Sequence, residues 1–359
     1  MLLEWIQVKT PADKTRVGVD PATHISRTSR LISYAQTFED VMLARVFAGR
    51  DNGFYVDVGA ADPVNLSVTK WFYDLGWSGL NIEPNKQLFD RLAADRQRDI
   101  NLDCGVGATV SEAKFFEPEV GELSSFDVRV RDNAQRNGIP GSTRTVAVMP
   151  LTDLLELHCQ GRDIDFLKID VEGWESEVLK GLDLRRYRPI VILIEATVPQ
   201  TKVESHIEWE PRILNADYSF VYFDGVNRFY LSNEHAEFKE HFTTPPNTFD
   251  EFETFPLVRA RTDAEQRLEA MHKLEQFIRE KGAVINEKDT VINEKDAVIN
   301  EKDAVIIQKD AVINQKDDVI NEKDAVINEK DAVINGILNS RIWRLTHPKW
   351  LARFRASFL

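Results

Sequence analysis

A seven-residue repeat close to DAVINEK fills residues 283–335 of this chain. Its mark is a Val-Ile pair whose valine recurs at positions 284, 291, 298, 305, 312, 319, 326 and 333. A period of seven is typical of supercoiled helices, and an odd period cannot keep one face of a β-strand apolar. The repeat therefore predicts a helix of roughly 80 Å, at 1.5 Å per residue.

The seam of such a coiled coil is not ideal. Its apolar residues are adjacent, whereas an ideal heptad has them three and four residues apart. If isoleucine takes one core position, the other falls on lysine, whose aliphatic stem can cover the seam while its charge reaches water. We expect residues 283–335 to form a coiled coil that makes the protein a homo-oligomer. A lone, partly frayed and solvated helix is the alternative.

Upstream of the repeat, residues 31–235 alternate short apolar runs with helical patterns. Apolar runs that end in a charged residue or glycine, with helices between them, are typical of a parallel, doubly wound α/β sheet with helices on both faces. The predicted strands are Phe54–Val58, Gly79–Ile82, Ile100–Asp103, Thr145–Met149, Phe166–Ile169, Ile190–Glu195 and Phe220–Asp224. The predicted helices are 38–48, 65–75, 85–95, 151–158 and 174–181.

The remaining segments differ in composition. Residues 1–30 are polar and predict a loose lead-in, and 253–282 predict a helical linker before the repeat. Gly336 breaks the helical pattern, and residues 336–359 combine basic and aromatic side chains without an acidic one. Such a tail suits an anionic membrane surface, or its aromatic residues close the end of a helical bundle.

Charge and cysteine content narrow the class of protein. The formal net charge is −14, which argues against nucleic-acid binding by the chain as a whole. The cysteines, Cys104 and Cys159, provide neither a disulfide framework nor a metal cluster. The N-terminus does not read as a secretory signal, and no apolar run is long enough for a transmembrane helix. We expect a cytoplasmic protein, with a peripheral place at the inner face of the membrane if the tail binds lipid.

The ends of the first strands predict a cofactor site. Asp57 lies in the first strand and is followed by Gly59 and Ala60, which let a ligand approach the backbone. Glu83 ends the next strand and can accept hydrogen bonds from ribose hydroxyls. The pattern G-x-G-x-x-G is missing, so no cradle for a pyrophosphate is predicted. An acid for the ribose without a phosphate loop favours an adenosyl ligand that lacks phosphates.

Further along, Asp103 precedes a glycine-containing turn and is placed to meet an adenine amine, beside Cys104. A surface aspartate before a turn would look the same.

A second group of charged residues predicts the reaction side. The segment LKIDVEGWE delivers Lys168, Asp170 and Glu172 to the end of an apolar strand, and Glu195 ends the following strand. Charged groups on a buried strand are costly unless they serve a purpose. A carboxylate of this group could take a proton from a substrate hydroxyl. Alternatively, Glu172 caps the next helix and Lys168 pairs with a neighbouring acid. No metal is assigned, although these three carboxylates would suit magnesium.

Several motifs together resemble the FkbM-type methyltransferases over residues 31–252. They are YAQTFED at 34–40, DVGA at 57–60, IEPN at 82–85, LKIDVEGWE at 167–175, IEAT at 194–197, YFDGVNRFY at 222–230 and PPNTFDEF at 245–252. The resemblance implies a Rossmann-like class I methyltransferase fold, S-adenosyl-L-methionine as donor, and transfer to a hydroxyl oxygen, often of a sugar in a bacterial surface polysaccharide.

By residue, the resemblance places Asp57, Gly59 and Glu83 at cofactor positions, with Asn85 in the same turn. It matches the segment with Asp170 and Glu172 to the family's signature. One departure concerns the loop after Gly59, where Asp62 and Pro63 stand in place of a second glycine. Alternatives to an active enzyme are an inactive methyltransferase-like scaffold organised by the coiled coil, or a nicotinamide-dependent sugar oxidoreductase.

Overall fold

The computed structural model describes residues 7–9, 30–119, 124–159 and 161–340. The chain forms two compact units, residues 1–263 and residues 264–359. The predicted basic and aromatic tail lies outside the described residues from 341 on, as does most of the predicted lead-in.

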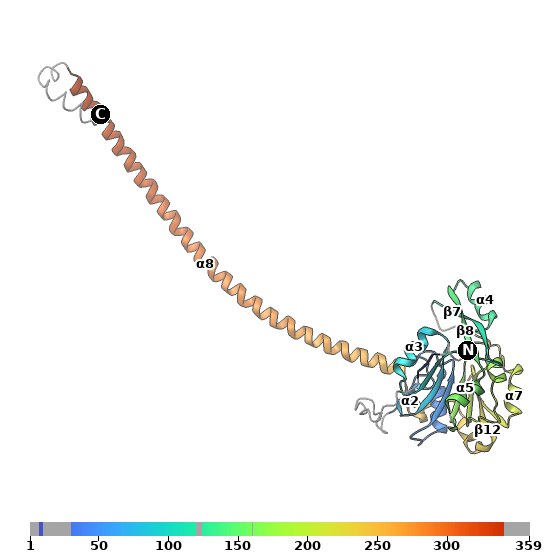
Figure 1. Ribbon diagram of the computed structural model, residues 1–359. Helices are drawn as coiled ribbons and strands as arrows, with labels where there is room; N and C mark the ends of the chain where they lie inside the picture. Colours follow the sequence, from blue (N-terminus) through green and yellow to red (C-terminus); the bar gives the residue numbers. More distant parts are fainter. Residues whose placement is uncertain (1–6, 10–29, 120–123, 160, 341–359) are drawn as a thin grey trace. The chain divides into compact units, whose positions relative to one another are not determined.

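The first unit is built on a mixed sheet (Figure 1). Among the described residues this sheet has eight strands in the order β1-β5-β4-β3-β9-β10-β12-β11. The strands β5, β4, β3, β9 and β10 are parallel, and β12 runs antiparallel to both of its neighbours. Their bounds are Gln7–Lys9 (β1), Phe54–Val58 (β3), Ser78–Ile82 (β4), Ile100–Asp103 (β5), Phe166–Ile169 (β9), Val191–Glu195 (β10), Tyr218–Phe223 (β11) and Asn227–Ser232 (β12).

Helices cover both faces of this sheet because successive side chains of a strand point to opposite sides. Val56 and Val58 of β3 belong to one apolar cluster, with side chains of α5, α6 and α7. Tyr55 belongs to the other cluster, with side chains of α1 and α2. The helices of the first unit are Glu39–Val46 (α1), Lys70–Asp74 (α2), Lys86–Asp95 (α3), Val128–Arg136 (α4), Leu151–His158 (α5), Glu175–Lys180 (α6) and Glu210–Leu214 (α7), with 3-10 turns at His206–Glu208 (η3), Asn233–Phe242 (η4) and Thr248–Asp250 (η5).

Two smaller sheets complete the first unit. Strands Gly105–Val106 (β6), Ser111–Pro118 (β7) and Gly141–Met149 (β8) form one sheet, in the order β6-β8-β7. Strands Leu31–Ser33 (β2) and Phe252–Thr254 (β13) pair in parallel and bring the two ends of the domain together.

The predicted α/β fold is confirmed, with corrections to its details. The predicted strands at Phe54–Val58, Ile100–Asp103 and Phe166–Ile169 have the observed bounds. The expectation of a parallel sheet was wrong at β12, which returns through a turn at Gly225 and must therefore run antiparallel to β11. The predicted strand Thr145–Met149 belongs to β8 of a smaller sheet. Within the predicted lead-in, β1 pairs with β5.

The long helix α8 spans Phe255–Asn339 and contains the whole seven-residue repeat. Its expected break at Gly336 was wrong, because the helix continues to Asn339. A lone Gly costs an exposed helix only about 1 kcal/mol, too little to end a helix of this length. The valines and isoleucines of the repeat are about half exposed, for example Val291 at 44% and Ile292 at 54%. Within the described residues, no helix combines the length and apolarity needed to span a bilayer.

Candidate active site

The carboxyl ends of the parallel strands β3, β4, β9 and β10 meet at one edge of the sheet, where ligands bind in folds of this kind. A cavity of about 120 Å³ opens at this edge. The predicted site residues that line it are Gly59, Ala60, Glu83, Lys168, Asp170 and Glu172. Residues from three separate strand ends therefore share one cavity.

Gly59 occupies a position that only glycine can take. Its φ is +79°, in the left-handed region that side chains disfavour. A Cβ atom there would lie 1.8 Å from the carbonyl oxygen of Asp170. The loop after β3 thus passes in direct contact with the turn after β9, and residues of both line the cavity.

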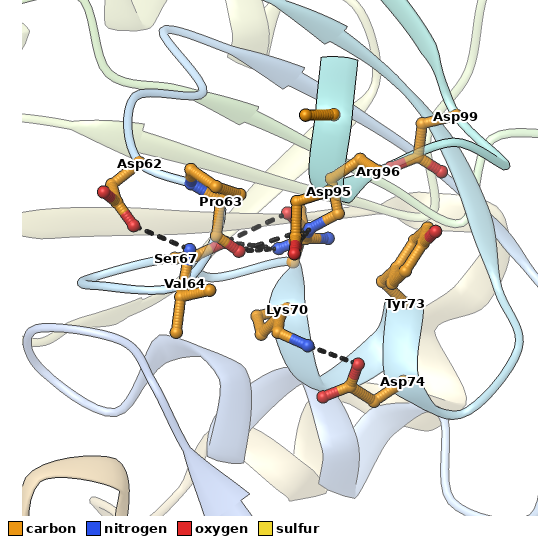
Figure 2. A network of polar contacts seen from close by, with 12 residues as sticks. Asp62, Pro63, Val64, Ser67, Lys70, Tyr73, Asp74, Asp95, Arg96 and Asp99 are labelled. Carbon is orange, nitrogen blue, oxygen red and sulfur yellow. Dashed lines mark hydrogen bonds and ion pairs between the residues drawn. The ribbon is translucent and has the colours of Figure 1, made fainter. Parts of the chain in front are cut away.

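The loop that departs from the family pattern is held by side chains rather than by a second glycine (Figure 2). The carboxylate of Asp62 accepts hydrogen bonds from the backbone N–H of Val64 at 2.8 Å and of Asn65 at 2.8 Å. Arg96, whose side chain is 0% exposed, donates to the carbonyl oxygen of Pro63 and, at 3.1 Å, to the hydroxyl of Ser67. The buried guanidinium of Arg96 therefore holds this loop in place by hydrogen bonds.

Glu83 joins the loops that follow β3 and β4. One carboxylate oxygen accepts the N–H of Ala61 at 2.8 Å, and the other accepts the N–H of Asn85 at 2.6 Å. Burial, opposed by these two hydrogen bonds, raises the pKa of Glu83 to about 7. Each oxygen keeps acceptor capacity for a ligand hydroxyl.

Lys168 is buried on β9 and contacts both sides of the edge. Its ammonium lies 3.2 Å from the carboxylate of Asp57 and 3.5 Å from that of Asp170, and it donates to the carbonyl oxygen of Gly59 at 2.8 Å. Burial opposes its charge, but Asp57 and Asp170 outweigh burial and raise the pKa of Lys168. Asp57 also accepts a hydrogen bond from Thr69 at 3.2 Å. The proposed pairing of Lys168 with a neighbouring acid is therefore present.

Three carboxylates gather beyond the ends of β9 and β10. Asp170, Glu172 and Glu195 each offer an oxygen within 4.8 Å of the others. Burial, with the nearby carboxylates, raises the pKa of Glu195 well above its ordinary value. The turn that carries Glu172 is held by Glu175, which accepts the N–H of Gly173 at 3.0 Å.

The strand ends that line the cavity lie within a known protein domain family. Residues 57–220 match the family model described as the methyltransferase FkbM domain. The chain carries an FkbM methyltransferase domain. The match begins at Asp57 in β3 and ends within β11, so it contains every strand end described above. No curated protein matches the chain.

Four predicted cofactor residues of the FkbM domain are not among the described residues that line the cavity: Asp57, which pairs with Lys168, and Asn85, Asp103 and Cys104. Asn85 caps α3, because its side chain accepts the N–H groups of Gln87 and Leu88. Asp103 lies 3.4 Å from Arg144 and is not among the described residues that line the cavity. Cys104 is 0% exposed within an apolar cluster, so its thiol is a core group and the expectation of a cofactor contact by this side chain was wrong.

The structure also adds residues that the sequence did not single out. Arg96 and Glu175 are buried and hold the two turns of the FkbM domain that meet at Gly59. A second cavity of about 660 Å³ lies between α4 and the segment after β10, and Gly173 is among its lining residues. Glu172, the residue before Gly173, lines the first cavity. The two cavities therefore border the same turn.

Proposed function

We propose that this domain is an S-adenosylmethionine-dependent O-methyltransferase that methylates a hydroxyl of a sugar in a bacterial surface polysaccharide or related glycan. The observation that carries the proposal is the acidic cavity at the carboxyl edge of the sheet, bordered by Glu83 on one side and by Asp170 and Glu172 on the other. The FkbM family supports methyl transfer in general.

The residues around the first cavity fit this donor. S-adenosylmethionine has a ribose, a cationic sulfonium and an ammonium group, but no phosphate. Glu83 offers carboxylate oxygens to the ribose, and Asp170 and Glu172 add to the negative lining of the cavity. Lys168, the lysine among the described lining residues, is paired with Asp57 and Asp170 and is not placed to bind a phosphate. The donor, when bound, supplies a methyl group activated by its sulfonium.

The second cavity supports a sugar as acceptor. Its lining mixes hydrogen-bonding side chains such as Arg129, Asn133 and Gln200 with the apolar surfaces of Ile207 and Trp209. Such a mixture suits a ring with hydroxyls on its edge. Its volume of about 660 Å³ is enough for more than one sugar unit.

The reaction requires alignment and removal of one proton. The acceptor oxygen attacks the methyl carbon, the carbon–sulfur bond breaks with its electron pair left on sulfur, and the hydroxyl proton leaves. Asp170 is the group we assign to receive that proton or to position the hydroxyl, because it borders the cavity and its side chain is 38% exposed. Lys168 holds the Asp170 carboxylate in place at 3.5 Å.

Calorimetry with S-adenosylhomocysteine tests the donor. The intact protein should bind it, and Glu83→Gln should weaken binding by about tenfold or more, because a charge-assisted hydrogen bond contributes about 1.5–3 kcal/mol. Glu156→Gln is the matched control, because Glu156 is an exposed residue on α5 that pairs with Arg186. Absence of binding by the intact protein would refute the enzyme and favour the inactive scaffold.

Mass spectrometry of surface glycans tests the acceptor. Glycans from cells with the intact gene should carry a methyl increment that is lost when the gene is deleted and that returns with the wild-type copy. An Asp170→Asn copy should fail to restore it. Identical glycans in all strains would overturn the assignment of a glycan acceptor.

We also propose that residues 283–335 assemble copies of the protein as a coiled coil. The support is the half-exposed valine and isoleucine stripe of α8, which a helix cannot cover by itself. Deletion of 283–335 should lower the mass measured by light scattering while binding of S-adenosylhomocysteine is retained. An unchanged mass would refute the coiled coil.

The basic and aromatic tail supports a proposed place at the inner face of the cytoplasmic membrane. Its arginines, lysine and tryptophans suit anionic headgroups. The protein should float with anionic liposomes, and deletion of residues 340–359 should abolish flotation. Equal flotation of the two forms would refute a role for the tail.

A further inference from the structure

The carboxylates of Asp170, Glu172 and Glu195 form a compact acidic group at the end of β9 and β10. Their oxygens lie within 4.8 Å of one another. Two oxygens bound to one calcium-sized ion at about 2.3–2.6 Å lie at most about 5 Å apart, so the spread is one that a single divalent cation can bridge. Closeness alone does not make a metal site, because acidic residues also cluster on surfaces without an ion.

The decisive observation concerns Glu195. Glu195 is only 8% exposed, and its Oε2 atom is buried without a hydrogen-bond partner among the described residues. A buried polar atom is normally paired, and a buried carboxylate needs a donor or a cation. Because this carboxylate has an oxygen within 4.8 Å of oxygens of Asp170 and Glu172, a cation held by the three carboxylates would supply the missing partner.

Lys168 does not supply that partner. Its ammonium already contacts Asp57 at 3.2 Å, the carbonyl oxygen of Gly59 at 2.8 Å and Asp170 at 3.5 Å. Neither a hydrogen bond nor an ion pair joins Lys168 to Glu195 in the described structure, although its charge acts on Glu195 from a distance.

The backbone directs Glu172 into the group. Glu172 has a φ of +51°, which is unusual for a residue with a side chain. The hydroxyl of Ser125 donates to its carbonyl oxygen at 2.7 Å, and Glu175 accepts the N–H groups on either side, from Val171 and Gly173. This turn is thus fixed by three contacts, which is what a ligand of a metal ion requires.

We propose that Asp170, Glu172 and Glu195 bind one divalent cation of the magnesium, manganese and calcium type. Oxygen ligands alone select these hard cations over zinc or copper. The cation site can form without the methyl donor, but its role in the reaction rests on the proposed function. Between the first cavity and the second, the cation would bind the acceptor hydroxyl, favour loss of its proton and orient the oxygen toward the methyl group.

The test is to measure manganese binding by the full-length protein with electron paramagnetic resonance. The wild-type protein, freed of metal with a chelator, should bind one equivalent. Glu195→Gln should weaken binding by about tenfold or more, and Asp170→Asn and Glu172→Gln should do the same, because each removes one anionic ligand.

Glu39→Gln is the matched control. Glu39 is also buried, at 4% exposure, and lines the first cavity, but it accepts hydrogen bonds from Thr37 and Asn227 and is not one of the three clustered carboxylates. Its variant should bind manganese as the wild type does. Because glutamine keeps the shape of glutamate, Glu195→Gln should stay folded, and its thermal unfolding without metal checks this. Magnesium or calcium should raise the melting temperature of the wild type but not of Glu195→Gln.

The proposal is overturned if the wild type binds no manganese, or if Glu195→Gln binds it as tightly as the wild type. Either result leaves the proposed methyltransferase intact when S-adenosylhomocysteine still binds without metal. Loss of S-adenosylhomocysteine binding with manganese binding retained would instead overturn the proposed function and keep the cation site.

Discussion

Replacing Arg96 by methionine should weaken both the fold and the cofactor site, because this arginine connects the two. Its side chain is 0% exposed. It donates to the carbonyl oxygen of Pro63, to Ser67 at 3.1 Å and to Tyr55 at 3.3 Å (Figure 2 shows Pro63, Ser67 and Arg96). Methionine has nearly the same length but offers no donor, so each of these oxygens would lose its charged donor in the interior.

The loss of stability in Arg96→Met can be worked out from these contacts. A hydrogen bond from a charged donor contributes about 1.5–3 kcal/mol, and removing one member of a buried charged network costs about 3–5 kcal/mol. Asp99 keeps three donors, Tyr55 at 2.7 Å, Gly79 at 2.8 Å and Asn81 at 2.9 Å, but loses a nearby cation. We therefore expect the free energy of unfolding to fall by about 3–5 kcal/mol. For a domain of this size, the melting temperature falls by roughly 6–20 °C.

Urea unfolding followed by tryptophan fluorescence, to which the buried Trp77 contributes, measures this loss. Arg98→Met is the control, because Arg98 is exposed near the same helix and stacks over the ring of Tyr73 at 3.8 Å without contacting the loop. Its variant should lose less than about 1 kcal/mol. Below its melting temperature, Arg96→Met should also bind S-adenosylhomocysteine about tenfold more weakly. Equal stability of the two variants would refute the argument that Arg96 anchors the loop.

Three further predictions concern the cavity. Burial raises the pKa of Glu83 to about 7 from an ordinary value of 4.5. The folded state therefore keeps a proton that the unfolded chain releases, and the free energy of unfolding should fall by about 2 kcal/mol as the pH rises from about 5 to 7. Glu83→Gln should reduce this slope in urea titrations at several pH values, and an unchanged slope would contradict the burial argument. Gly59→Ala should abolish binding of S-adenosylhomocysteine, because the added Cβ would lie 1.8 Å from the carbonyl oxygen of Asp170. Gly49→Ala is the control, because Gly49 has a similar φ of +81° but faces open space, and this variant should only lower the stability by about 1 kcal/mol. Lys168→Met should destabilise the domain by about 3–5 kcal/mol because it leaves Asp57 buried without its cation, and adding Asp57→Asn should recover part of that loss; strictly additive effects in the unfolding titrations would show that the pair is not coupled.

The positions of the site residues could be predicted because strand ends are visible in the sequence. An apolar run followed by an acid and a glycine, as at Phe54–Val58 and Phe166–Ile169, indicates both the strand and its carboxyl edge. Parallel pairing then brings Glu83 and Asp170 to one cavity. This inference needs only topology.

What the sequence could not predict depends on contacts between distant residues. Arg96 looks like any arginine at a helix end until the loop at Pro63 packs over it. The helix α4 has a polar sequence with only Ala134 buried, so it carries no apolar stripe to reveal it. Cys104 was predicted at the cofactor site because it follows a strand end, but its side chain lies in the apolar core. Orientation about the strand end, rather than position along it, was the missing information.

The near identity of the repeats in α8 has a mechanical consequence. If two copies pair along this helix, sliding one by seven residues moves it by about 10 Å and places almost every side chain against an equivalent one. Contacts alone would then distinguish poorly between one alignment and the next. Only the interruptions of the pattern mark a particular alignment, and they are Thr290, Ile307, Gln308, Gln315 and Asp318. The distance between paired catalytic domains would thus be set in steps of one repeat, and gain or loss of a repeat would change the reach of the arm without disturbing its pairing.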